Sequence, residues 1–153
     1  MDNQRRRLLK AVSVVSATLA ATLFKPLVAW ATTWNKDAFA AKSAADALKI
    51  LGTSDTVASK DLLIEAPQIA ENGAVVPIEI TSNIPGTTSI ALIIDKNPFP
   101  LVSKFDFVEG ALPFVKVNVK MNETSEVRAL ATAGRRNYVA TKEIKVTIGG
   151  CGG

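Results

Sequence analysis

Hydrophobic and polar residues alternate in short runs from Asp61 onward, as in Val115-Lys116-Val117-Asn118-Val119. Alternation with a period of two is typical of a strand with one buried and one exposed face. We predict strands over residues 61–66, 74–83, 88–95, 101–107, 113–121, 126–133 and 138–148. Turn residues rich in Gly, Pro and Asn separate these runs. About seven short strands at this spacing predict a mainly β fold, an antiparallel β-sandwich of the immunoglobulin-like type.

Two apolar stretches depart from this alternation. The run Ile90–Ile94 is apolar throughout, so we expect either a strand covered on both faces or an edge that a partner covers. An Ala-rich segment, residues 35–51 followed by Gly52, predicts one N-terminal α-helix. Packing of its apolar stripe inside the domain is favoured over binding to a partner, and the stripe includes Phe39, Ala47, Ile50 and Leu51. Both stretches are candidates for a partner-facing surface.

The first 31 residues have the three parts of a secretory signal peptide. A basic start precedes an apolar stretch and the sequence Ala29-Trp30-Ala31, which predicts cleavage after Ala31. Arg5-Arg6-Arg7 followed by Leu8-Leu9-Lys10 resembles the twin-arginine class, so we expect a periplasmic protein. An uncleaved membrane anchor is the alternative, but the stretch is short for a span of about 20 residues. We therefore expect no membrane attachment in the mature form.

Removal of this signal changes the charge of the chain. The whole sequence has a net charge of +4, and residues 1–31 hold five basic residues and one acidic residue, so the mature chain has a net charge of zero. No basic surface for a nucleic acid is expected. The predicted organisation is a signal peptide (1–31), a helix with a linker (32–60), a sandwich (61–148) and a tail (149–153).

The composition excludes much catalytic chemistry. Histidine is absent and there is one cysteine, which rules out a Ser-His-Asp triad, a Cys-His pair and zinc or haem sites built on these residues. We find no phosphate-binding loop motif. The chain is therefore expected to be no enzyme and to hold no cofactor or metal. A single cysteine also allows no intramolecular disulfide.

That cysteine lies in the tail Gly149-Gly150-Cys151-Gly152-Gly153. Free cysteine is among the most buried residue types, yet glycines on both sides leave Cys151 with no neighbouring side chain to cover it. The predicted last strand ends next to the tail, and an extended chain gains about 3.3 Å per residue. We interpret the tail as a short, flexible arm that carries a reactive thiol on a rigid body. A disordered tail with an incidental thiol is the alternative.

Two stretches resemble the SoxY family, the sulfur carriers of periplasmic thiosulfate oxidation. Residues 146–153 look like the GGCGG swinging arm of that family, and residues 69–78 are similar to the first hairpin of its sandwich. The resemblance implies that Cys151 is the covalent attachment site of thiosulfate-derived sulfonate and persulfide adducts. It further implies that Gly149, Gly150, Gly152 and Gly153 keep the arm flexible.

The resemblance also implies partners. A SoxZ-like subunit, itself immunoglobulin-like, is expected to form a heterodimer with the chain. A haem-containing enzyme would conjugate thiosulfate to Cys151, a hydrolase would release sulfate, and a sulfane dehydrogenase would oxidise the remaining persulfide where it is present. Carriage on Cys151 would need no cofactor beyond the covalently bound sulfur.

Other functions for the tail remain open from the residues. An assembly subunit that carries nothing could use Cys151 for an intermolecular disulfide, and reduction would then abolish its function. A ubiquitin-like use of the final Gly152-Gly153 requires ATP and a cytoplasmic enzyme, which the signal peptide contradicts. Prenylation at Cys151 is excluded, because a C-a-a-X box needs three residues after the cysteine.

Overall fold

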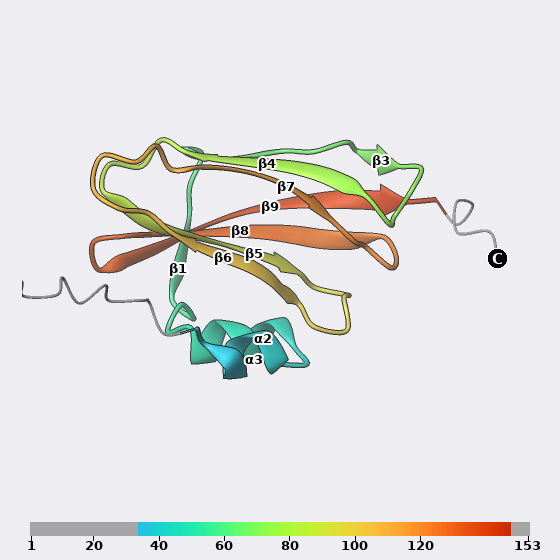
Figure 1. The fold of residues 1–153 in the computed structure, drawn as a ribbon, viewed down its shortest axis with the longest axis horizontal. Helices are drawn as coiled ribbons and strands as arrows, with labels where there is room; N and C mark the ends of the chain where they lie inside the picture. The colour runs from blue at the N-terminus through green and yellow to red at the C-terminus, as the bar shows by residue number, and fades with distance from the viewer. Residues whose placement is uncertain (1–33, 148–153) are drawn as a thin grey trace, which may run out of the picture. The chain divides into compact units, whose positions relative to one another are not determined.

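Two packed β-sheets form the body of the protein in the computed structural model, which describes residues 34–147 (Figure 1). The strands of this part are β1 (Thr56–Ala58), β2 (Leu62–Glu65), β3 (Ile69–Ala70), β4 (Val76–Ser82), β5 (Thr87–Ile94), β6 (Leu101–Asp106), β7 (Phe114–Val119), β8 (Ser125–Ala133) and β9 (Arg136–Val146). A six-stranded sheet has the order β1-β9-β8-β5-β6 with β3 also paired to β9, and a three-stranded sheet has the order β2-β4-β7. The predicted mainly β, immunoglobulin-like sandwich is confirmed. The predicted signal peptide and the glycine-rich tail lie outside the described residues.

All seven predicted strands are present, and their alternation has the expected cause. In β4, for example, Val76, Ile78 and Ile80 are fully buried between the sheets while Pro77 is exposed. The core between the sheets takes its buried side chains from both of them, including Ile90, Leu92, Val115, Val127 and Ile144. Burial of such side chains contributes roughly 1.5–3 kcal/mol each. This core is what holds the two sheets together.

The apolar run Ile90–Ile94 is a strand covered on both faces. It forms part of β5, which lies between β8 and β6 in the sheet. Ile90, Leu92 and Ile94 point into the main core, whereas Ala91 and Ile93 belong to a second cluster under the helices. The alternative of an edge covered by a partner is therefore wrong.

The helix predicted over residues 35–51 is divided in two, α2 (Lys36–Ala40) and α3 (Ala44–Ile50). The backbone of Ala41 leaves the helical region, with ψ of 140°. Ser43 then begins α3 as its N-cap, since its Oγ accepts a hydrogen bond of 3.1 Å from the N–H of Asp46. α3 ends at Ile50, and the N–H groups of Gly52 and Thr53 donate to carbonyls of its last turn.

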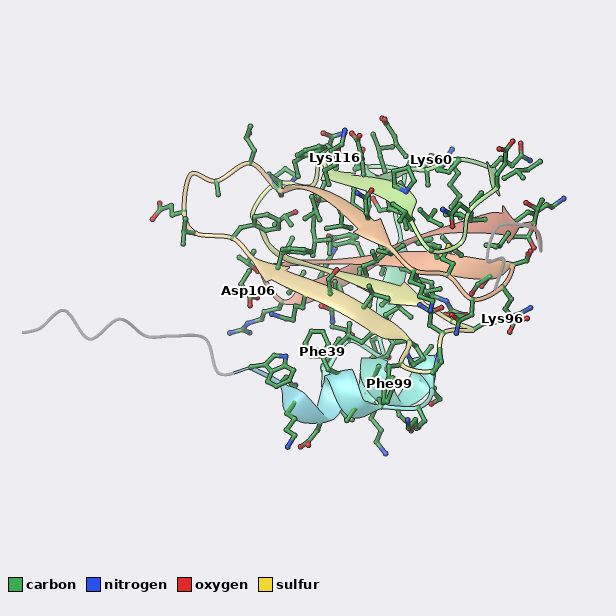
Figure 2. All side chains as sticks on the ribbon, turned by 45° about the vertical axis from the view of Figure 1, so that its right-hand side comes forward. Phe39, Lys60, Lys96, Phe99, Asp106 and Lys116 are labelled. Carbon is green, nitrogen blue, oxygen red and sulfur yellow. The ribbon has the colours of Figure 1, made fainter. Side chains whose placement is uncertain are left out.

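The two helices cover part of the outer face of the six-stranded sheet. Buried alanines of α2 and α3 pack with Ile93, Leu101 and Leu130, and Phe39 lies at the edge of this cluster. Figure 2 shows Phe39 between the helices and the sheet, and Lys116 on the opposite side of the sandwich. The apolar stripe of the helices is thus used for packing inside the domain, as favoured from the sequence.

Two short strands were not predicted, and both pair in parallel with β9. β1 places Thr56 opposite Asn137, and β3 places Ala70 opposite Val146. Between them the chain crosses to the other sheet to form β2. The expected hairpin over residues 69–78 is wrong, because β3 and β4 lie in different sheets. The segment instead connects the edge of one sheet to the centre of the other.

Candidate functional site

The strand that leads to the arm is hydrogen-bonded on both sides up to its last residues. On one side Ser125 of β8 pairs with Ile144, and on the other side β3 pairs with Lys145 and Val146. The N–H of Thr147 donates to the carbonyl of Ala70 at 3.1 Å, beyond the end of β9 itself. The sheet therefore holds the chain at least as far as Thr147, the last described residue, and the strand end predicted at 148 lies outside the described residues.

A side chain and a close backbone contact complete this anchorage. Val146 N–H donates to Oγ1 of Thr124 at 3.0 Å. The carbonyl of Gly73 accepts from the N–H of Met121 at 2.8 Å. A Cβ at Gly73 would collide with the carbonyl oxygen of Met121 and lie 2.9 Å from Cγ1 of Val146, so only glycine fits there. We call Ala70, Gly73, Met121, Thr124, Val146 and Thr147 the arm base.

The loops around the arm base are tied to one another. Asn97, in the β5–β6 loop, donates through Nδ2 to the carbonyl of Lys120 at 2.8 Å and accepts through Oδ1 from the N–H of Asn122 at 3.4 Å. Lys96 N–H donates to Oγ of Ser125 at 3.1 Å. Together with the Gly73–Met121 hydrogen bond, these contacts join the β3–β4, β5–β6 and β7–β8 loops into one fixed end of the sandwich, where β9 ends (Figure 1).

The predicted site residues follow directly on this fixed end. Cys151 and the arm glycines Gly149, Gly150, Gly152 and Gly153 lie outside the described residues. From Thr147, the four residues to Cys151 can span at most about 14 Å. The sequence predicted these tail residues but not the arm base, since Gly73 falls in the turn region between two predicted strands and nothing local links it to Met121 or Val146.

Two hollows among the described residues lie far from the arm base. One of about 530 Å³ is formed by the β4–β5 and β6–β7 loops, and one of about 560 Å³ includes Arg135 and Arg136 at the start of β9. β9 is 11 residues long, so these hollows are roughly 30 Å from its end. Residues 34–147 contain no group of three or more His, Cys, Asp or Glu side chains placed to hold a metal ion. No helix in the same range is long and apolar enough to cross a membrane.

Comparison with known proteins identifies the family. The model of sulfur oxidation protein SoxY matches residues 47–151, which is more than half of the chain and reaches Cys151. The chain belongs to the SoxY family. The resemblance noted in the sequence is thereby confirmed. A sulfur-oxidation carrier role for the chain is supported, and a carrier role is consistent with the expectation that it is no enzyme.

One solved structure agrees with this family. The chain is similar to the sulfur carrier protein SoxY from Chlorobium limicola f thiosulfatophilum, with 34% identity and a TM-score of 0.61 over 67% of this chain and 96% of that one. A chain from a structure of T cell recognition of the superantigen toxic shock syndrome toxin-1 has 13% identity and a TM-score of 0.41, covering 56% of this chain and 99% of that one. The latter likeness is too low to bear on fold or function. The comparison with curated proteins finds no match.

Proposed function

We propose that the chain carries sulfur-oxidation intermediates as covalent adducts on Cys151 and presents them to separate enzymes. The observation that carries this proposal is that the SoxY match extends to Cys151, only four residues beyond the hydrogen-bonded Thr147. The rigid sandwich then positions the start of the arm, and the length of the arm sets how far the Cys151 thiol can extend into an enzyme. The thiolate is the reacting form of cysteine, and no histidine of this chain can tune its pKa. Under this proposal the receiving enzymes supply the charged groups that favour the thiolate.

In the proposed cycle a haem enzyme joins thiosulfate to the Cys151 thiolate and accepts two electrons, which gives Cys-S-S-sulfonate. A hydrolase uses water to release the sulfonate as sulfate and leaves a persulfide. Where a sulfane dehydrogenase is present, it takes three oxygen atoms from water and accepts six electrons, which converts the persulfide to Cys-S-sulfonate. A second hydrolysis then releases the sulfonate as sulfate and restores the thiol. The proposed compartment is the periplasm, and the proposed stable partner is a SoxZ-like subunit.

The first test is the intact mass of the mature protein isolated from its own organism during growth on a reduced sulfur compound. We expect additions of sulfur atoms or of a thiosulfonate group, mapped to Cys151 and lost on mild reduction. A bare thiol under every growth condition would contradict the proposal. A disulfide dimer alone would contradict it as well and would favour an assembly subunit.

A larger side chain in the arm is expected to slow the delivery of the sulfur adduct to the enzymes without affecting the fold. Replacing Gly150 by valine adds a β-branched side chain that narrows the conformations open to the arm. The core of the sandwich is made by residues that precede Gly150 in the sequence, so we expect an unchanged melting temperature together with slower loading and unloading of Cys151. Enzymatic turnover and thermal unfolding, measured on the same preparation, separate the two effects. Unchanged turnover would show that arm flexibility is not needed.

A further inference from the structure

The loop between β3 and β4 contains a chemically labile pair of residues, Asn72-Gly73. Of all the asparagines in the sequence, Asn72 alone is followed by glycine. Asparagine is thermolabile in proteins, because the peptide nitrogen of the next residue can attack the side-chain carboxamide. Glycine has no side chain to hinder that attack and gives the backbone the freedom that it needs. This loop is therefore the candidate for a spontaneous change of the chain.

The fold requires the glycine of this pair. A Cβ at position 73 would collide with the carbonyl oxygen of Met121 and lie 2.9 Å from Cγ1 of Val146. A residue with a larger side chain at this position would protect Asn72, but the arm base has no space for one. The contact that fixes the end of the sandwich thus also keeps Asn72 next to glycine.

The reacting groups of the pair are accessible and oriented. Asn72 is exposed, and its Oδ1 accepts a hydrogen bond of 2.9 Å from the N–H of Ala74. This hydrogen bond spans the peptide nitrogen of Gly73 and withdraws electron density from the carboxamide carbon. Within residues 34–147, neither the N–H of Gly73 nor Nδ2 of Asn72 donates a hydrogen bond. Neither the nucleophile nor the leaving group is therefore held back by a partner.

We propose that Asn72 converts spontaneously to isoaspartate in the folded protein and that this change releases the arm base. Hydroxide removes the proton from the Gly73 nitrogen, and that nitrogen forms a bond to Cγ of Asn72. The bond from Cγ to Nδ2 breaks and ammonia leaves, which gives a succinimide ring. Water then opens the ring, mainly at the backbone carbonyl, so the main chain continues through Cγ. One water is consumed and one ammonia is released, with no oxidation or reduction.

The product alters a segment that the arm base holds from both sides. Before Asn72, the carbonyl of Ala70 accepts the N–H of Thr147, and after it the carbonyl of Gly73 accepts the N–H of Met121. Isoaspartate adds one methylene group to the main chain between these two anchors, together with one negative charge. A lengthened chain cannot keep both anchors in place, so we expect the end of β9 to loosen. This inference does not rest on the proposed function, because it concerns the body of the protein alone.

The test follows the full mature chain, folded and kept reduced, during incubation at neutral and mildly alkaline pH. Peptide mass mapping should show a gain of one dalton at Asn72 at least about tenfold faster than at the exposed Asn83 and Asn122, which precede larger residues. The rate should rise with pH, and an isoaspartyl methyltransferase with S-adenosylmethionine should label the product. In the modified fraction, separated by ion exchange, amides of Val146 and Thr147 should exchange about tenfold faster.

Two variants separate the chemistry from its effect on the arm base. Asn72→Ser keeps an oxygen that can accept the N–H of Ala74 but cannot form a succinimide, so its exchange rates should not change during incubation. Freshly prepared Asn72→Asp carries the new charge on a main chain of normal length and should exchange like the unmodified protein.

Three results would overturn the proposal. Modification of Asn72 no faster than that of Asn83, or only after unfolding in urea, would show that the fold protects the pair. Aspartate as the sole product would exclude ring closure. Unchanged exchange at Val146 and Thr147 in the isoaspartate fraction would show that the arm base tolerates the longer chain.

Discussion

Replacing Cys151 by serine is expected to abolish carriage of sulfur completely while leaving the fold intact. Serine keeps the size of the side chain but cannot form the disulfide-type bond to thiosulfate sulfur that the proposed function requires. The core of the sandwich is made by residues that precede Thr147, so we expect the fold to survive the replacement. The measurements are intact mass after incubation with thiosulfate and the conjugating enzyme, and thiosulfate-dependent electron transfer in the complete enzyme system.

A relocated thiol provides the matched control for this variant. Thr147→Cys in the Cys151→Ser background restores one thiol, but places it on backbone that is hydrogen-bonded to Ala70. Thr147 is exposed, so a small thiol reagent should modify the new cysteine. The enzymes should not load it, because it cannot extend from the sheet into a channel. Loading at position 147, or thiosulfate oxidation by Cys151→Ser alone, would contradict the proposed function.

Gly73→Ala adds one methyl group to the arm base, and we expect it to lower the free energy of unfolding more than a methyl group added elsewhere in the arm base would. The added Cβ meets the carbonyl of Met121 and Cγ1 of Val146, and neither can move without disturbing a paired segment. Overpacking of this kind costs about 1–3 kcal/mol of unfolding free energy. We expect that loss in chemical denaturation, together with faster amide exchange at Lys145, Val146 and Thr147.

Ala74→Ser, at the next residue of the same loop, is the control for Gly73→Ala. Ala74 is exposed, so this change should leave both unfolding free energy and amide exchange near those of the unmodified protein. Faster release of the β9 end in Gly73→Ala should also slow enzymatic loading, since the start of the arm is then less well placed. Unchanged exchange at residues 145–147 would show that Gly73 does not hold the arm base.

The sequence allowed the main strands and the carrier tail to be predicted, for identifiable reasons. Strands such as β4 and β7 have one face in the core and one outside, so their alternation is visible in the residues alone. The tail could be predicted because four glycines and the only cysteine of the chain stand together in residues 149–153. The signal peptide and the tail lie outside the described residues, so these two predictions remain predictions as far as structure is concerned.

What could not be predicted depends on contacts between distant segments. β1 and β3 have only three and two residues, and their pairing exists because β9 offers a long edge. The division of the helix depends on Ser43, which competes as an N-cap within a segment whose alanines favour continuous helix. The arm base joins Gly73, Met121 and Val146, and no local pattern links residues so far apart.

The double-sided pairing of β9 has a mechanical consequence. A receiving enzyme that grips the arm pulls along the axis of β9, and the hydrogen bonds to β8, β1 and β3 run across that axis. Tension therefore loads many bonds in shear at once instead of peeling them apart one by one. Under the proposed function, the strand would therefore act as a tether that keeps the sandwich in shape while an enzyme draws the tail in and releases it.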